Sequence, residues 1–299
     1  MSEATLSPAT GSPHGGGQRT GSSLRAAWRN RRTRTLTSLT LALLVVVAVV
    51  VVGGVVRDDA AVTDLTQKTL APSGEHWFGT DPYGRDLFER TMVGLRLSLV
   101  VGTTAAVLSG LISIALTLFA TVGGRWAMAT VNWLIDLFLA LPHLVLLILV
   151  AFALGGGTDA VVLAVGLTHW PRLTRVLISV AREINATDYV ALSRTFGSSR
   201  RFVARRHLAV HLVPHFSIGV ILMFPHAILH EAALSFLGLG IDPGQPAIGI
   251  LLADSMRYLS AGHWWLAALP GLALLLIVKL IDRIGDDLRM LSDPRSAHL

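Results

Sequence analysis

Residues 97–122 read LSLVVGTTAAVLSGLISIALTLFATV, and no side chain in this run carries a charge. About 20 helical residues cross the ~30 Å hydrocarbon core of a bilayer, so the run is long enough to span a membrane. Hydrocarbon offers no partner to a backbone amide, and a spanning segment must therefore pair its amides internally. The stretch predicts a transmembrane helix.

Uncharged runs of the same kind lie on both sides of this stretch. Two of them are shorter than the others and can be extended through flanking apolar residues. The runs cover residues 36–56, 137–158, 160–170, 216–230 and 258–278. Together with the first stretch they predict an all-α polytopic membrane protein with six transmembrane helices.

The composition supports a chain that is solvated mainly by lipid. Hydrophobic residues make up 52% and charged residues 15% of the 299 residues, and the mean hydropathy is +0.60. A soluble domain carries about 25% charged residues, because its surface faces water. Composition therefore excludes a disordered or collagen-like protein and disfavours a soluble enzyme. The absence of Cys excludes a disulfide framework, a thiolate metal site and a cysteine nucleophile.

The distribution of basic residues predicts the orientation of the chain. There are 25 Lys and Arg residues against 19 Asp and Glu residues, and most of the basic ones lie in four segments. These are residues 1–35, the turn near Arg125, residues 172–210 and residues 279–299. The positive-inside rule places these segments in the cytoplasm, and both termini with them. Because the arginines follow the predicted topology and form no continuous face, nucleic acid is not an expected partner.

Five segments make up the expected organisation. The first apolar run is expected to be retained, because Arg57-Asp58-Asp59 follows it without a small-residue cleavage site. The segments are a disordered tail and basic juxtamembrane segment at 1–34, the first transmembrane helix at 35–56, an extracytoplasmic loop at 57–96, a five-helix core at 97–284 and a cytoplasmic tail at 285–299. In the loop, TDPYG at 80–84 is expected to form a turn.

The cytoplasmic loop at 181–210 is the largest polar segment within the core. Thr187 or Asp188 can cap a short helix that runs through Phe196, and Gly197 can end it in a left-handed conformation. A second helix then carries the arginines of the sequence RRFVARR at 200–206. Two interpretations remain open: the segment is a docking element for a cytoplasmic partner, or it is a basic loop that holds the topology.

Six stretches of this chain resemble one family, in that family's order. They are HWFGTDPYGRDLFERTMVGLRLSLVVG (76–102), LIDLFLALP (134–142), DYVALSRTFGSSRRFVARRHL (188–208), EAALSFLGLG (231–240), WWLAALPGLALLL (264–276) and GDDLRMLSDPR (285–295). The family comprises the permease subunits of ABC importers for dipeptides, oligopeptides and nickel. The resemblance implies the ABC type I importer permease fold, with a cytoplasmic coupling helix, in a bacterial-type inner membrane.

The resemblance also implies roles for residues of the cytoplasmic loop. The coupling helix would begin near Asp188 and dock in a cleft of the ATPase subunit. Tyr189 and Phe196 would be its apolar anchors and Arg194 a charged contact, and Gly197 would be the family's glycine. The chain departs from the family pattern at 191–193, where Ala-Leu-Ser replaces Glu-Ala-Ala, and at 209–211, where Ala-Val-His replaces Leu-Pro-Asn.

The partners implied by the resemblance are a second homologous permease subunit, two ATP-binding cassette subunits and an extracytoplasmic solute-binding protein, besides membrane lipid. The imported solute would be a small peptide or a nickel or other metal chelate. The chain itself is expected to bind no cofactor and to have no catalytic residue. A phosphate-binding P-loop needs Gly-Lys-Ser/Thr, whereas Lys68 and Lys279 follow Gln67 and Val278, so ATP would be used by a partner. The alternative is an ion-driven secondary transporter, which predicts an internal repeat that the sequence does not contain.

Four histidines within or beside the spans are candidates for the translocation path: His143, His169, His226 and His230. His226 and His230 are four residues apart and share a helical face, so they could bind a borderline metal ion or its chelate. Alternatively, these imidazoles hydrogen-bond to neighbouring carbonyls. Glu231 is expected to be a structural acid. A zinc protease is disfavoured, because His-Glu-x-x-His would need a histidine where Leu234 stands.

Overall fold

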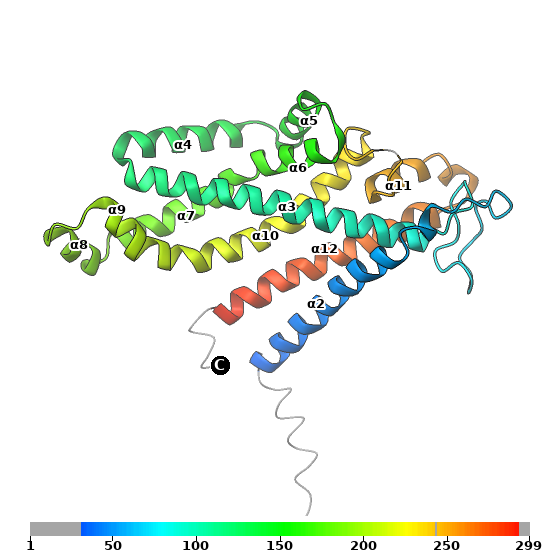
Figure 1. Ribbon diagram of the computed structural model, residues 1–299, viewed down its shortest axis with the longest axis horizontal. Coiled ribbons are helices and arrows are strands. Elements are labelled where there is room, and N and C mark those ends of the chain that lie inside the picture. The colour runs from blue at the N-terminus through cyan, green and yellow to red at the C-terminus, as the bar shows by residue number, and fades with distance from the viewer. Residues whose placement is uncertain (1–30, 243, 293–299) are drawn as a thin grey trace, which may run out of the picture.

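The computed structural model describes residues 31–242 and 244–292 (Figure 1). The predicted tail up to residue 30 and the end of the predicted C-terminal tail, residues 293–299, lie outside the described residues. All regular elements of the described part are helical, apart from one isolated antiparallel bridge between Thr80 and Asp86. The prediction of an all-α membrane protein is confirmed.

Among the described residues, the first and last helices pack beside each other and against the longest helix. α2 (Arg31–Val55) and α12 (Trp265–Ser292) contact one another, and α2 also lies along α3 (Leu87–Val122). Buried aliphatic side chains fill the space between these three helices and α10 (Ala209–Phe236), among them Leu95, Ile228 and Ile277. Figure 1 shows α2 in blue beside α12 in red.

α3 begins at Leu87, whereas the uncharged run begins at Leu97. The Asp86 side chain accepts hydrogen bonds from the backbone amides of Phe88 and Glu89, which satisfies two unpaired donors of the first helical turn. The helix therefore starts at this cap and carries Arg90 and Arg96 in its first turns. The predicted loop at 57–96 is correspondingly shorter, with a 3₁₀ turn, η1 (Asp59–Ala61), near its beginning.

The prediction of one helix over 137–158 is wrong. The chain forms α4 (Gly124–Ala140) and α5 (His143–Ala153), which meet at an angle of 97°. Proline has no backbone N–H and disfavours helical backbone in the residue before it, and Leu141 before Pro142 is extended. The apolar run is therefore broken at Pro142 into two helices.

The remaining spans extend beyond their uncharged runs. α6 (Gly157–Thr168) and α7 (Trp170–Asn185) join in one span. The next span consists of α9 (Arg200–Val203), the π turn η2 (Ala204–Leu208) and α10 (Ala209–Phe236). The run predicted at 258–278 begins at Tyr258, directly before the 3₁₀ turn η3 (Leu259–Ala261), whereas α12 begins only at Trp265. Between α10 and η3 lies α11 (Ile248–Ser255).

Within the described residues, five helices are long and apolar enough to cross a membrane, or six if the bent pair α4–α5 counts as one span. The start of α2, the end of α12 and the short helices α8 (Asp188–Thr195) and α9 lie toward one end of the bundle (Figure 1). The loop before α3 and helix α11 lie toward the other end. The segments rich in arginine therefore gather at one end of the protein.

Candidate functional site

The short helix α8 (Asp188–Thr195) projects from one end of the bundle. Thr187 precedes it with extended backbone, and Gly197 follows it with a left-handed φ of +85°. The Gly197 amide donates to the Arg194 carbonyl at 2.9 Å and the Ser198 amide donates to the Ser193 carbonyl at 3.1 Å. These bonds satisfy carbonyls that the helix end would leave unpaired. The predicted left-handed termination at Gly197 is confirmed.

The two faces of α8 differ in burial. Val190 is fully buried in a cluster that also contains Ile184 of α7 and Leu208 of η2, so the helix is anchored to two spans. On the outer face, Tyr189 is exposed and 80% of the Phe196 surface is accessible. A large aromatic side chain this exposed at the tip of a projection is typical of an interaction surface.

Arg194 and Tyr189 also have partners within the chain. An Nη2 of Arg194 donates to the Asn185 side-chain oxygen at 2.7 Å, and the Tyr189 hydroxyl lies 3.3 Å from Nε2 of His211. Asp188 is exposed in the first turn of α8. The predicted second helix begins at Arg200 but does not end within the segment. No Gly or Pro lies between residues 200 and 213, so this helix continues through η2 into α10.

Two helices of the candidate spans, α4 and α7, are joined by an exposed ion pair. Nη2 of Arg175 in α7 lies 2.5 Å from Oδ1 of Asp136 in α4, and the two side chains are 57% and 70% exposed. Arg172, one turn earlier in α7, is exposed as well. The opposite face of α7 is buried, with Leu173 and Leu177 in the core. Charges at bilayer depth cost several kcal/mol against lipid, so this face requires cover by protein or water.

Three of the four candidate histidines meet in space. His143 is the first residue of α5, His169 separates α6 from α7, and His230 lies in α10. The Nε2 atoms of His143 and His169 are 3.4 Å apart, and one ring nitrogen from each of the three residues lies within 4.8 Å of the other two. His226 is exposed one turn before His230 and is not part of this group. We call His143, His169 and His230 the histidine cluster.

The cluster and the ion pair could not be found from residue spacing. The cluster joins side chains from three helices, and Arg175 has no neighbour in sequence that indicates its partner in α4. By contrast, the four-residue spacing identified His226 and His230 as neighbours without revealing which other side chains face His230. Glu231 turns away from the cluster and is fully buried, where it accepts hydrogen bonds from Ser98 at 2.5 Å and Ser235 at 2.9 Å.

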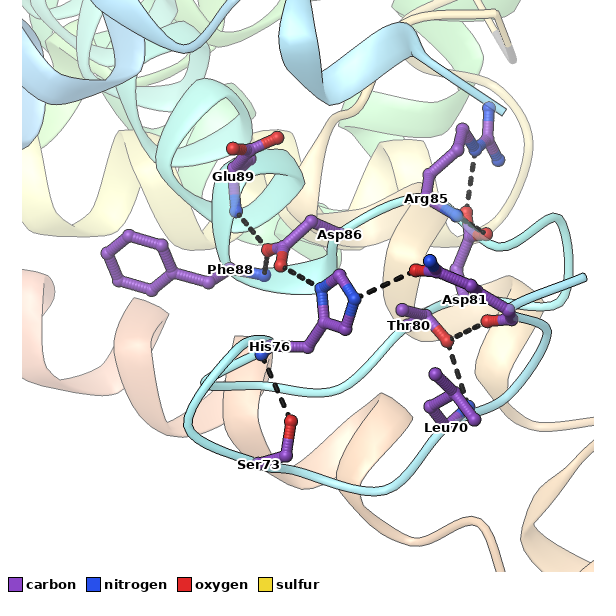
Figure 2. Close-up of polar contacts among 10 residues, drawn as sticks. Leu70, Ser73, His76, Thr80, Asp81, Arg85, Asp86, Phe88 and Glu89 are labelled. Carbon is purple, nitrogen blue, oxygen red and sulfur yellow. Dashed lines mark hydrogen bonds and ion pairs between the residues drawn. The ribbon is translucent and has the colours of Figure 1, made fainter. Parts of the chain in front are cut away.

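The opposite end of the bundle carries an ordered loop before α3 (Figure 2). Asp81 accepts hydrogen bonds from the Tyr83 and Arg85 amides and forms ion pairs with the side chains of Arg85 and buried Arg90. Its carbonyl accepts from the Gly84 amide at 2.9 Å, which confirms the predicted turn at 80–84. The His76 ring lies 2.8 Å from the Asp86 carboxylate, so the loop is tied to the cap of α3.

Comparison with known proteins gives one family and a set of relatives. The sequence profile of the family described as binding-protein-dependent transport system inner membrane component matches residues 92–288. A putative peptide permease of Brucella suis biovar 1 is 39% identical over 236 residues, which is 78% of each chain.

Two further relatives carry more specific names. The dipeptide transport system permease protein DppC of Bacillus subtilis is 33% identical over 77% of this chain and 72% of its own. A probable D,D-dipeptide transport system permease protein of Escherichia coli is 34% identical over 80% of both chains. The region matched by the family profile begins in α3 and ends in α12, so it includes α8, the ion pair and the histidine cluster.

Proposed function

The chain belongs to the family of binding-protein-dependent transport system inner membrane components, and we propose that it is the permease subunit of an ATP-driven importer of small peptides. The observation that carries the proposal is the exposed charged face of α4 and α7. A small peptide is a zwitterion with a carboxylate at one end and an ammonium group at the other. On this face Arg172 and Arg175 can bind the carboxylate, and Asp136 can bind the ammonium group. The names of the relatives support the same class of solute.

A second, homologous permease subunit would complete the path. Arg172, Arg175 and Asp136 lie on a face that lipid cannot solvate cheaply. Apposition of two such faces would enclose a polar passage, with the charged side chains inside and the apolar faces toward lipid. The four histidines predicted for the translocation path, His143, His169, His226 and His230, are assigned to the lining of this passage.

The helix α8 would dock into one of two ATP-binding cassette subunits. Phe196 and Tyr189 supply apolar contacts, and Asp188 and Arg194 supply charged ones. Because Val190 anchors α8 to the core and the following helix runs without interruption into α10, a displacement of the ATPase would move the span as a rigid body. ATP would be bound and hydrolysed by the cassette subunits, while this chain alternates between outward-open and inward-open states.

The proposed orientation places α8 and both termini in the cytoplasm. Most arginines of the described residues lie at that end of the bundle, as the positive-inside rule expects. The ordered loop before α3 would then face an extracytoplasmic solute-binding protein. Its turn is held by the buried Asp81–Arg90 pair and offers a rigid surface for docking.

A second candidate cargo is a nickel or other metal chelate. The histidine cluster favours it, because neutral imidazole is a good ligand for Ni²⁺, Cu²⁺ and Zn²⁺. An ion-driven secondary transporter is the competing mechanism, and it requires that the chain concentrate solute without an ATPase.

The test is dipeptide uptake into proteoliposomes. The complete assembly, with both permease subunits, the cassette subunits and the binding protein, is expected to accumulate labelled dipeptide only when ATP is enclosed with the cassette subunits. The purified chain alone is expected to accumulate none under a proton or sodium gradient. Gradient-driven accumulation by the chain alone would reject the ATP-driven mechanism in favour of secondary transport.

A further inference from the structure

We propose that the protein binds the phosphate group of an anionic phospholipid in a recess beside α8. The recess has a volume of about 490 Å³, and its lining comes from the end of α3, the start of α4 and the segment from α8 to α9. The polar lining includes the side chains of Arg125, Arg194, Ser198 and Arg200. We call this site the arginine recess.

The arginine recess lies where three candidate spans end. Gly123 is the single residue between the span Leu87–Val122 and the bent pair of helices that begins at Gly124. A third candidate span, Arg200–Phe236, begins at the recess as well. Because a spanning helix leaves the hydrocarbon at its end, the recess is placed at the level of the lipid headgroups.

The charge of the recess is positive and has no counter-charge within the chain. Arg125, Arg194 and Arg200 are exposed, and the ion pairs of the described residues include none of them. The lining likewise contains no acidic residue from the part of the chain that the structure describes. Three guanidinium groups that share one recess repel each other, so an anion between them is stabilising.

The hydrogen-bond donors of the recess suit phosphate oxygens. Arg194 donates one N–H to the Asn185 side chain at 2.7 Å, and a guanidinium carries five N–H groups, so others remain. Ser193 donates its hydroxyl hydrogen to the Ser198 oxygen at 2.9 Å, which leaves the Ser198 hydroxyl hydrogen for a ligand. The planar fork of an arginine can bind two oxygens of one phosphate at once.

The backbone at Gly124 allows Arg200 to reach the recess. Gly124 has a left-handed φ of +80°, and a Cβ added there would lie 2.6 Å from Nη1 of Arg200. The guanidinium of α9 therefore lies directly against the turn between α3 and α4, in the recess that Arg125 lines from the other side of this turn. The site is thus assembled from two segments that are far apart in the sequence.

The surroundings favour a lipid over a free phosphate ion or an acidic protein surface. Phe119 and Trp126, the sequence neighbours of the lining residues Ala120 and Arg125, are 56% and 79% exposed. Tryptophan is enriched at membrane interfaces, and exposed rings beside a headgroup site can contact acyl chains. The cytoplasmic leaflet is rich in anionic lipids, and placement of the recess in that leaflet rests on the proposed orientation.

A bound phosphate would join the segment from α8 to α9 to the turn between α3 and α4. Because α8 is the proposed docking helix, this contact would hold it in place against the bundle. Anionic lipid is therefore expected to increase ATP-dependent uptake by the complete assembly, a consequence that rests on the proposed function.

The site is tested by lipid binding to the purified full chain in neutral detergent micelles, measured by native mass spectrometry. Dioctanoyl phosphatidylglycerol is expected to bind about tenfold more tightly than dioctanoyl phosphatidylcholine, because only its net charge is negative. Arg125→Gln and Arg200→Gln should each weaken binding of phosphatidylglycerol about tenfold, the effect of losing one charged hydrogen bond. Arg205→Gln is the matched control, since Arg205 is exposed in η2 and does not line the recess. It should leave binding unchanged.

Four results would overturn the proposal. Equal affinity for the two lipids would show that the headgroup charge is not recognised, and an equal loss in Arg205→Gln would indicate general attraction by net charge. Displacement of phosphatidylglycerol by an equal concentration of inorganic phosphate would identify a site for free phosphate. Weaker binding of the cassette subunit by Arg125→Gln and Arg200→Gln, with lipid binding unchanged, would assign the recess to a protein partner. Lipid binding is measured on the chain alone, so its failure is distinguishable from a failure of the proposed transport function.

Discussion

Arg175 of α7 and Asp136 of α4 form an ion pair, with 2.5 Å between Nη2 and Oδ1, although both side chains are more than half exposed at the level of the membrane-spanning helices. Each residue alone would be an unpaired charge on a face that lipid cannot solvate. Substitution of a single partner is therefore expected to be more harmful than removal of both charges.

This expectation is tested with Asp136→Asn, Arg175→Gln and the double variant. Each single substitution should lower ATP-dependent dipeptide uptake by at least about tenfold, which corresponds to ~1.4 kcal/mol. The double substitution should recover part of the loss. Membrane yield is measured alongside, because an unpaired charge also hinders insertion. A double variant with no more uptake than the worse single variant would contradict the pairing.

Gly197 tests whether the end of α8 matters for docking. At its φ of +85°, a residue other than glycine is destabilised by roughly 1–2 kcal/mol. A Cβ added at this position would have no neighbouring atom within 4 Å, so it would not clash. Gly197→Val should therefore leave the bundle folded but distort the end of α8, with a loss of uptake and uncoupled ATP hydrolysis. Gly262→Val is the matched control, since φ there is +89° with equally open space. Equal losses in both variants would argue for a general effect of backbone strain.

The sequence predicts features that depend on local signals and misses those that depend on distant ones. The apolar runs identify the spanning segments, and Gly197 marks the end of α8, because helix length and left-handed termination are set by neighbouring residues. The apolar run at 137–158 predicts one helix where the structure has parts of two, because Pro142 divides the run. The ion pair between Asp136 and Arg175 is missed because a search for uncharged runs does not show which charged side chains beside those runs meet. Their pairing depends on how α4 packs against α7.

Phe196 is expected to act in docking and not in folding. With 80% of its surface accessible, Phe196→Ala should change the stability of the purified chain by less than about 0.5 kcal/mol. If the ring fills a pocket of the cassette subunit, the same substitution should weaken that interaction by about 2 kcal/mol or more. The effect is measured as the affinity of the cassette subunit for the chain in nanodiscs.

Trp77→Ala is the control for Phe196→Ala. It removes another exposed aromatic ring, from the loop at the other end, and should have no effect on the affinity. An unchanged affinity in Phe196→Ala would remove Phe196 from the proposed docking surface.

Asp81 is expected to hold the loop before α3 in place. It pairs with Arg90, whose side chain is 5% exposed, so Asp81→Asn would leave a buried guanidinium without its counter-charge. Removal of one partner from a buried pair costs about 3–5 kcal/mol, and the thermal midpoint of the purified chain should fall accordingly. Asp64→Asn is the control, because the Asp64 side chain is only partly buried and bonds only to Thr66 among the described contacts. If the loop is also the docking surface for the binding protein, Asp81→Asn should weaken binding-protein-dependent uptake more than it weakens the basal ATP hydrolysis of the assembly. Loss of both activities in equal proportion would instead indicate a purely structural role for the pair.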